Sequence, residues 1–353
     1  MSRLEERYRL VLRLLPAGYR QEWEDDMVAA FLESMDDDDP ETAEYAADYG
    51  RPGLAEVASI VSLAVRLRLG GSQAPARSYA WGQAVRLATL MAMLTHAVMV
   101  TASIAVTLWL SGKIAWLPAP APAWALTPPS GIWHTAWNLA GYAWLPAYLA
   151  LVLGHRRVAQ AVALLAIVPP AVTTAVEQAT NDVPLSVTPW AVRLIDILLV
   201  LAMAAFHRDA PPVPRRPWLL AIPIGILLVP LPLFAIQATS QAPRLLDWPG
   251  LSCVMVTAAI AVRLAGRASR QSASTLPWSL ALTLLAATTL ALRLVTLPDY
   301  IGQAQRTALG TIAVTEAIAV LAVALPLAGR AIRALRRLPP IPADGQAPTT
   351  PTG

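Results

Sequence analysis

Lysine and cysteine are almost absent from this sequence. Lys113 is the single lysine, Cys253 is the single cysteine, and arginine supplies the other basic residues. One cysteine excludes an intramolecular disulfide, so the thiol content does not indicate a compartment. The chain also has no glycine-rich loop that ends in lysine followed by serine or threonine, which excludes a phosphate-binding ATPase site of that type. The preference for arginine indicates GC-rich codons and a bacterial source.

Catalytic and metal-binding motifs are missing as well. The patterns HExxH, GxSxG and CxxC do not occur, and no two histidines have the spacing of metal ligands. The acidic run 36–39 lacks the alternating oxygen ligands and the glycine of a calcium loop, so we weigh a solvated helix cap against an ion site. Because no positive feature supports a reaction, the sequence predicts no enzyme: no catalytic residue, no cofactor and no metal.

Charged residues are scarce and unevenly distributed. Only 14% of the 353 residues are charged and 56% are hydrophobic, whereas about 25% of residues are charged in a soluble domain. Residues 1–60 carry 15 acidic and 6 basic side chains, and residues 61–353 carry 8 and 21. This composition predicts an integral membrane protein with an acidic N-terminal part. The first residues alternate charges and lack the apolar core of a signal peptide, so we expect the N-terminus to stay in the cytoplasm.

Eight segments are apolar enough to cross a bilayer, whose core of about 30 Å needs roughly 20 residues of helix. They are residues 87–110, 131–154, 158–176, 190–206, 218–238, 249–265, 276–297 and 307–328. We therefore predict an all-α fold with a bundle of about eight transmembrane helices over residues 79–330. A cytosolic module of three helices precedes it over residues 1–78, and a cytosolic basic segment with a disordered tail follows over residues 331–353.

The loops between these segments differ in charge. With the N-terminus inside, the inner connections hold 12 basic residues and the outer connections hold 3. Cytoplasmic loops retain arginine and lysine, and an odd number of spans would destroy this alternation. We predict a multi-pass protein of the cell membrane with both termini in the cytoplasm. The arginines of residues 330–337 fit an orientation signal and a contact with anionic lipid better than a nucleic-acid site, so no nucleic-acid partner is predicted.

Residues 1–78 have helical periodicity but too much charge to span a membrane. Pro16 ends the first predicted helix, Asp39 followed by Pro40 is typical of a helix start, and Gly70 with Gly71 ends the last helix. One apolar stripe per helix is expected to face the interior of a small bundle. The stripes are Leu4, Tyr8, Leu12 and Leu15; then Trp23, Met27, Phe31 and Met35; then Leu54, Val57, Val61 and Val65.

The same region resembles known proteins. The segments YRLVLRLLPAGYRQEWEDDMVAAF and ADYGRPGLAEVASIVSLAVRLRL are similar to the short cytosolic modules of certain orphan efflux-type permeases and of HAAS-type proteins associated with PadR transcriptional regulators. The matching positions are Leu15, Pro16, Tyr19, Arg20, Met27, Phe31, Gly50, Pro52 and Val57. The resemblance implies a regulatory membrane protein of an actinobacterial type, whose module acts in signalling or interaction.

The candidate interaction surface of the module is predicted on its second helix, at Tyr19, Arg20, Trp23, Met27 and Phe31. Two partners are considered for the acidic module: the arginine-rich inner loops of the same chain, and a basic cytosolic regulator or membrane protein. An anionic leaflet is expected to repel its acidic side chains. The oligomeric state does not follow from the sequence.

Ionisable side chains within membrane spans are costly and are often functional. Five are predicted in the outer half of the bilayer: Glu177, Arg193, Asp196, Arg293 and Glu316. Arg193 and Asp196 are three residues apart and can pair on one helix face. Arg293 and Glu316 can meet across the last helical hairpin. Two interpretations remain open for this polar cluster: ion pairs that join helices, or a pocket for a solute, a lipid headgroup or a proton.

Two functions from different classes follow. The first is a regulatory or scaffolding membrane protein whose cytosolic module meets a partner. The second is a permease or transport subunit without its own ATPase, which uses the polar cluster. Transport is less favoured for two reasons. The first and last four spans show no convincing similarity, and no loop is long enough for the large extracytoplasmic domain of the permeases that share the N-terminal resemblance.

Overall fold

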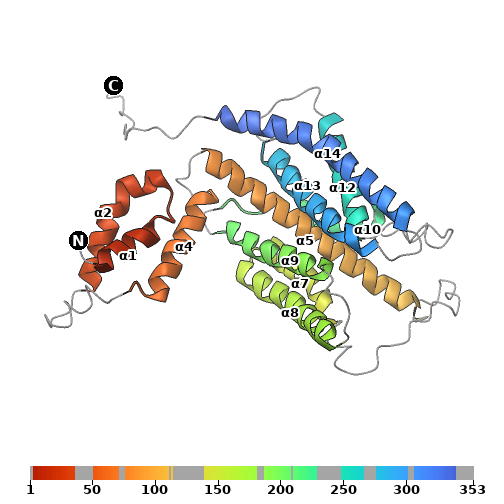
Figure 1. Ribbon diagram of the computed structural model, residues 1–353, viewed down its shortest axis with the longest axis horizontal. Helices are drawn as coiled ribbons and strands as arrows, with labels where there is room; N and C mark the ends of the chain where they lie inside the picture. Colours follow the sequence, from red (N-terminus) through yellow and green to blue (C-terminus); the bar gives the residue numbers. More distant parts are fainter. Residues whose placement is uncertain are drawn as a thin grey trace. The chain divides into compact units, whose positions relative to one another are not determined.

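The computed structural model describes residues 3–35, 51–70, 76–110, 113, 139–180, 187–207, 210–228, 248–265, 276–300 and 306–338. These residues form helices and their connecting turns, with no strand among them, which confirms the all-α prediction (Figure 1). The acidic run 36–39, the predicted helix start at Asp39 and the C-terminal tail from residue 339 lie outside the described residues.

Five helices are long and apolar enough to cross a membrane. They lie in α5 (Ala76–Leu110), α8 (Arg156–Thr180), α9 (Thr188–Ala202) with the short helix Met203–Ala205, α13 (Leu276–Thr296) with the short helix Leu297–Tyr300, and α14 (Arg306–Arg336). These five coincide with the first, third, fourth, seventh and eighth predicted spans. The chain therefore has the long apolar helices of a multi-pass membrane protein.

The other three predicted spans correspond to shorter helices. The second ends in an apolar helix over Gly141–Val152, formed by the turn Gly141–Ala143 and α7 (Trp144–Val152). The fifth begins in α10 (Arg215–Leu228), and the sixth is the apolar stretch Pro249–Ala265 of α12 (Trp248–Ala265). Residues 131–138 and 229–238, which complete the second and fifth predicted spans, lie outside the described residues.

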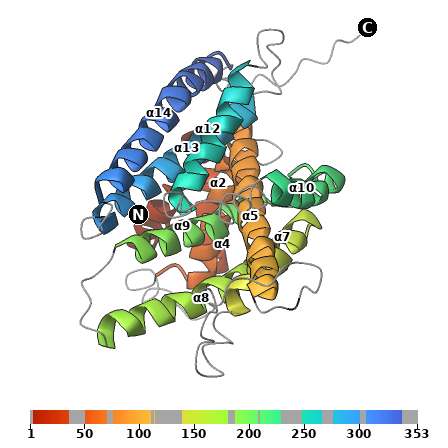
Figure 2. The same ribbon diagram turned by 90° about the vertical axis from the view of Figure 1, so that its right-hand side faces the viewer.

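The chain divides into two compact units. Unit 1 comprises the described parts of residues 1–83, 207–210 and 334–353, and unit 2 comprises those of 84–206 and 211–333. Within unit 2, α5 contributes to two separate cores. Leu90, Met93 and Ala97 pack with α7, α8 and α9, whereas Met91 packs on the core of α12, α13 and α14. Figure 1 shows α5 between these two groups of helices, and Figure 2 gives the view turned by 90°.

Hydrogen bonds in unit 2 join helix ends that are predicted to lie on the same side of the membrane. At predicted inner ends, Arg156 donates to the Ala204 carbonyl at 3.3 Å and Arg215 donates to the Leu153 carbonyl at 3.4 Å. At predicted outer ends, the Trp190 indole donates to Gln178 at 2.7 Å. These contacts place the turn before α8 beside the turn after α9, as expected for helices that alternate in direction.

Two further contacts follow the same pattern. At the outer ends of unit 2, the Thr188 hydroxyl lies 3.5 Å from the Val295 carbonyl, which brings the start of α9 to the end of α13. Within unit 1, Arg77 donates to the carbonyls of Arg336 and Leu338 at 3.2 and 3.3 Å. The Arg77 guanidinium, in the first turn of α5, thus caps the C-terminus of α14.

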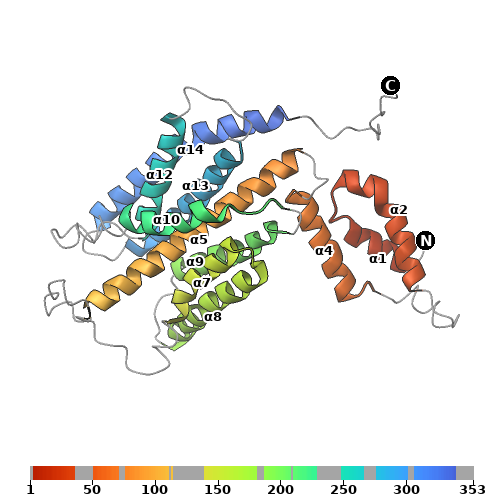
Figure 3. The same cartoon turned by 180° about the vertical axis from the view of Figure 1, so that it is seen from behind.

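The N-terminal helices of unit 1 share one core of buried side chains. The ribbons of these helices are drawn in Figure 1 and seen from behind in Figure 3. In α1 (Arg3–Leu12) and the turn after it, the predicted stripe of Leu4, Tyr8, Leu12 and Leu15 is buried, which confirms it. This stripe packs against α2 (Ala17–Ser34) and α4 (Leu54–Arg68). Proline at position 16 precedes α2, where its fixed φ suits a helix start.

The predicted stripe of α2 is only partly correct. Phe31 is buried together with Val28, but Trp23 is 44% exposed and Met35 is 38% exposed. An interval of four residues advances an α-helix by about 40°, so the line from Trp23 to Met35 winds away from one face by about 120°. The buried face therefore follows intervals of three and four residues around Phe31.

The predicted stripe of α4 is not the buried side of the helix, contrary to our expectation, although Val57 and Val65 are half-buried. Leu54 is 90% exposed and Val61 is 42% exposed, whereas Ile60 and Ala64 are buried in the core. The sequence of α4 is apolar on two sides, so periodicity alone does not decide which side packs. The hydrogen bond from Tyr8 to Glu56, at 3.0 Å, lies on the packed side.

Two glycines allow the end of α4 and the start of α5 to approach each other closely within unit 1. Gly70 has φ +85°, which confirms the predicted end of the helix at this residue. A Cβ on Gly70 would lie 2.8 Å from Cα of Tyr79, and a Cβ on Gly82 would overlap the Leu69 carbonyl oxygen. Only glycine permits this close approach of the two backbones.

Candidate functional site

Three helices of unit 2 meet at the carboxylate of Asp196. This side chain is 2% exposed on α9. Its Oδ2 lies 2.9 Å from Nη1 of Arg193, one turn earlier on the same helix, and its Oδ1 lies 3.5 Å from Nε2 of His96 on α5. The His96 ring stacks on Trp144 of α7 with centroids 4.3 Å apart. One buried carboxylate thus connects α5 and α9, and the stacked ring adds α7.

The charges in this group balance. The carboxylate of Asp196 and the guanidinium of Arg193 sum to zero when the imidazole is neutral, so the group enters an apolar layer without net charge. Such pairing is the usual condition for ionisable residues in a membrane. A proton on the imidazole would lie between the carboxylate and the indole face, which attract a cation, and near the Arg193 guanidinium, which repels one. The contacts of this group join helices.

A second ion pair joins the last two helices. Nη2 of Arg293 on α13 lies 2.5 Å from Oε2 of Glu316 on α14. The side chains are 2% and 11% exposed, respectively, so little water reaches either charge. The same two helices also share an apolar core, which includes Leu282 and Ala286 of α13 and Val320 of α14. It connects the two helices that the sequence predicted to form a hairpin.

The five residues of the predicted polar cluster thus have three different settings. Arg193 and Asp196 form one pair, Arg293 and Glu316 form another, and Glu177 lies exposed on α8. Both pairs have the partners that their spacing and predicted topology suggested.

Sequence reasoning missed the participation of His96 and Trp144. A histidine in the middle of an apolar span is a signal for a polar contact, but its partner lies on a helix 100 residues away in the chain. Helical periodicity within one segment does not show which distant helix packs against it. Only the packing of α5 against α9 decides the contact.

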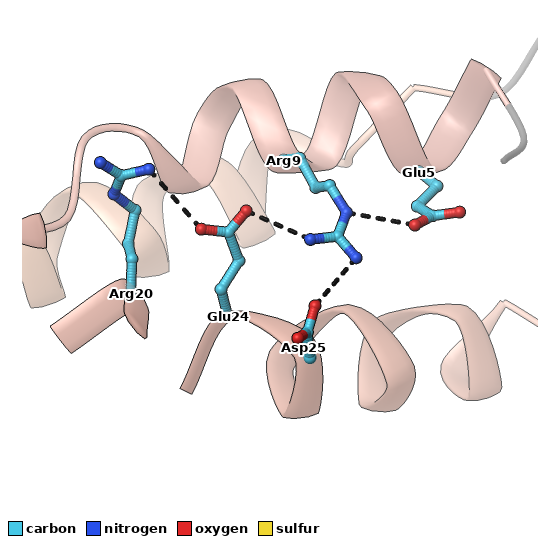
Figure 4. Close-up of polar contacts among 5 residues, drawn as sticks. All are labelled: Glu5, Arg9, Arg20, Glu24 and Asp25. Atoms are coloured by element: carbon cyan, nitrogen blue, oxygen red, sulfur yellow. Dashed lines mark hydrogen bonds and ion pairs between the residues drawn. The ribbon is translucent and has the colours of Figure 1, made fainter. Parts of the chain in front are cut away.

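The N-terminal helices carry a second group of charged residues, shown in Figure 4. The guanidinium of Arg9 reaches Glu5 at 3.1 Å, Glu24 at 3.3 Å and Asp25 at 3.0 Å, while Arg20 lies 3.6 Å from Glu24. Arg9 is on α1 and the last two carboxylates are on α2. The network therefore aligns these helices along their polar edge, and it is partly open to solvent and to salt.

Tyr8 forms the polar contact inside the core of the N-terminal helices. Its ring stacks on Phe31 with centroids 4.0 Å apart, and its hydroxyl donates to Glu56 at 3.0 Å. Burial and the hydrogen bond to the Glu56 carboxylate raise the pKa of Tyr8 to about 12. One side chain thus links α1, α2 and α4.

The predicted interaction surface on α2 is smaller than the sequence suggested. Trp23 is exposed, Tyr19 packs beside it with ring centroids 6.5 Å apart, and Arg20 is held by its ion pair. Phe31, in contrast, is 7% exposed, while Tyr19 and Met27 are both half-buried and pack against the core. Trp23 is therefore the exposed member of the predicted surface and Tyr19, Arg20 and Met27 are half-buried, whereas Phe31 belongs to the interior because α1 and α4 cover it.

Comparisons with models of protein families, with curated proteins and with solved structures found no match. Within the described residues, no three histidine, cysteine, aspartate or glutamate side chains gather in a way that could hold a metal ion. The two intramembrane ion groups and the exposed part of α2 are therefore the candidate sites from which a function is inferred.

Proposed function

We propose that this protein is a regulatory or scaffolding protein of the cell membrane, whose N-terminal helices form a cytosolic module that binds a partner protein. One observation carries the proposal: α1, α2 and α4 close a core of their own while leaving a large aromatic side chain, Trp23, exposed. Tryptophan, tyrosine and arginine are enriched in the energetic centres of protein interfaces. All three occur together on α2, at Trp23, Tyr19 and Arg20.

The proposal includes the resemblance to the modules of HAAS-type proteins and orphan permeases. Tyr19 and Arg20, two of the positions that carry the resemblance, are half-buried on α2, where Tyr19 packs beside the exposed Trp23. A cytosolic regulator is therefore the partner class that we propose.

The proposal also includes about eight spans with both termini in the cytoplasm. The hydrogen bonds between helix ends support it, because each joins two ends that the charge asymmetry assigns to the same side. The contact of Arg77 with the carbonyl of Arg336 is the most informative, since it brings the start of the first span to the end of the last one. Such a contact favours an even number of crossings.

Cysteine labelling tests the orientation. In a Cys253→Ala background, a cysteine at Lys113 should react with a membrane-impermeant maleimide in intact cells, and a cysteine at Arg156 should react only after the cells are permeabilised. The opposite result would reject the cytoplasmic placement of the termini.

Photo-crosslinking in living cells tests the partner. A photoreactive amino acid at position 23 of the full-length chain should give an adduct with one defined protein. The same amino acid at Ala29, which is exposed on another side of α2, is the matched control and should not. An identical set of adducts at both positions, or none at either, would refute a specific surface around Trp23.

A transport function is the second candidate, and the His96 contact favours it. A titratable imidazole beside a buried carboxylate, on two different helices, is a feature of proton relays in transporters. If the protein moves protons, proteoliposomes with a trapped pH-sensitive dye should show proton entry under an imposed gradient. Asp196→Asn should reduce this entry while Glu177→Gln, at an exposed position, leaves it unchanged. Equal rates for both variants and for the wild type would reject this function.

A further inference from the structure

Helix α4 has two apolar sides, and only one of them packs. Ile60 and Ala64 are buried in the core of the N-terminal helices, with Leu63 and Leu67 beside them. The opposite side carries Leu54, Val57, Ala58, Val61 and Val65, which share one stripe at intervals of three and four residues. Leu54 and Val61, its largest side chains, are 90% and 42% exposed. An apolar stripe of this length requires a cover that the other described helices of the N-terminal group do not provide.

The charges around this outer stripe differ from those of the neighbouring helices. No acidic side chain is exposed on α4, where the one acidic residue, Glu56, accepts the hydrogen bond of Tyr8. Arg66 and Arg68 lie exposed in its last turn, on different sides of the helix, and the Arg68 guanidinium donates one hydrogen bond to the Leu14 carbonyl at 2.9 Å. Among residues 3–35 and 51–70, which the structure describes, the exposed carboxylates are on α1 and α2: Glu6, Glu22, Asp25, Asp26 and Glu33. The outer side of α4 is thus apolar and ends in Arg68, a combination that complements an anionic lipid surface.

The C-terminal end of α4 touches the start of the first membrane-spanning helix. Gly82 of α5 packs so closely on the Leu69 carbonyl that a Cβ would overlap it, and Gly70 approaches Tyr79 in the same way. Tyr79 and Trp81 are exposed aromatic residues at this end of α5. Tyrosine and tryptophan at the end of a membrane span lie at the level of the lipid headgroups. The last turn of α4 is therefore held at the depth of the headgroups.

We propose that α4 lies on the cytoplasmic leaflet of the membrane, with Leu54 and Val61 at the boundary of headgroups and acyl chains and with Arg68 at the level of the anionic headgroups. This inference rests on the cytoplasmic placement of the N-terminal helices in the proposed function. It also refines the expectation that an anionic leaflet repels the acidic module, because within residues 3–35 and 51–70 the exposed carboxylates are on α1 and α2 and not on α4. The module thus has a lipid-facing helix, α4, and a partner-facing helix, α2.

Lipid-borne quenching tests this placement in the full-length protein. In the Cys253→Ala background, an environment-sensitive fluorophore is attached to Val61→Cys and, as the matched control, to Ser59→Cys, which is exposed on another side of α4. Leu54→Cys provides a second outer position that makes little contact within the fold. The proteins are placed one per nanodisc, in phosphatidylcholine and phosphatidylglycerol that carry a nitroxide on the acyl chain near the headgroup.

Fluorophores at positions 54 and 61 should be shifted to the blue and quenched by the nitroxide lipid, while the fluorophore at position 59 should be quenched by iodide in the water. Quenching of positions 54 and 61 by iodide alone would overturn the proposal. Protection of both positions from iodide and from the nitroxide would also overturn it, because a protein surface would then cover the stripe. The crosslink at position 23 is on α2, so its presence or absence tests the partner independently of α4.

Discussion

Replacing Glu316 by glutamine is the sharpest test of the intramembrane ion pairs. The substitution keeps the size of the side chain and removes the negative charge that lies 2.5 Å from the Arg293 guanidinium on α13. Surface ion pairs contribute about 0–1 kcal/mol, but this range does not apply here because the Arg293 side chain is 2% exposed. Loss of one partner from a buried pair costs about 3–5 kcal/mol. The amide oxygen of glutamine still accepts a hydrogen bond, so we expect a value near the lower limit, about 3 kcal/mol.

The measurement is the equilibrium unfolding of the purified protein in mixed micelles, with denaturing detergent as the perturbant. Glu177→Gln makes the same chemical change at an exposed position of α8 and should alter the free energy of unfolding by less than about 0.5 kcal/mol. A double variant, Arg293→Met with Glu316→Leu, removes both charges and should recover most of the lost stability, because two apolar side chains can replace a buried pair.

Two results would refute this reasoning. If Glu316→Gln is as stable as the wild type, the pair does not hold α13 against α14. If the double variant is as unstable as the single one, the loss comes from packing and not from an uncompensated charge. Unchanged stability together with a lost cellular activity would instead favour a polar pocket at this position.

Two further predictions concern the N-terminal helices. Tyr8→Phe removes the hydrogen bond to Glu56 and should cost about 1 kcal/mol at neutral pH, measured by thermal unfolding. The pKa of Tyr8 is raised from 10.0 to about 12, so the neutral phenol stabilises the fold fully below pH 10.0. This stabilisation is lost as the pH rises through about 12. If the wild type and the Tyr8→Phe variant lose stability in parallel over this interval, the prediction is wrong. Gly82→Ala should displace α5 from the Leu69 carbonyl and increase proteolysis between α4 and α5. Gly53→Ala is the control and should not increase proteolysis, because no atom lies within 4 Å of the added Cβ. Equal cleavage of the two variants would mean that the contact of Gly82 with Leu69 does not form.

Patterns along the chain were sufficient for the all-α class, for five long apolar helices and for the buried stripe of α1. These features depend on local physics. The length of an apolar run decides whether a helix can cross a bilayer, and the periodicity of a helix with one apolar side decides which side is buried. Spacing along the chain also suggested the pair Arg193 and Asp196, because both are on one helix face.

Packing between distant helices decided the remaining features. The sequence of α4 offers two apolar sides, and only the tertiary structure shows that Ile60 packs while Val61 faces outward. His96 reaches Asp196 because α5 and α9 pack together, although 100 residues separate them. A one-dimensional pattern records the angle of a side chain around its own helix but not the identity of the neighbouring helix. The sequence by itself therefore determined that this chain has the long apolar helices of a membrane protein. The tertiary structure decided which of its polar and apolar side chains are in contact.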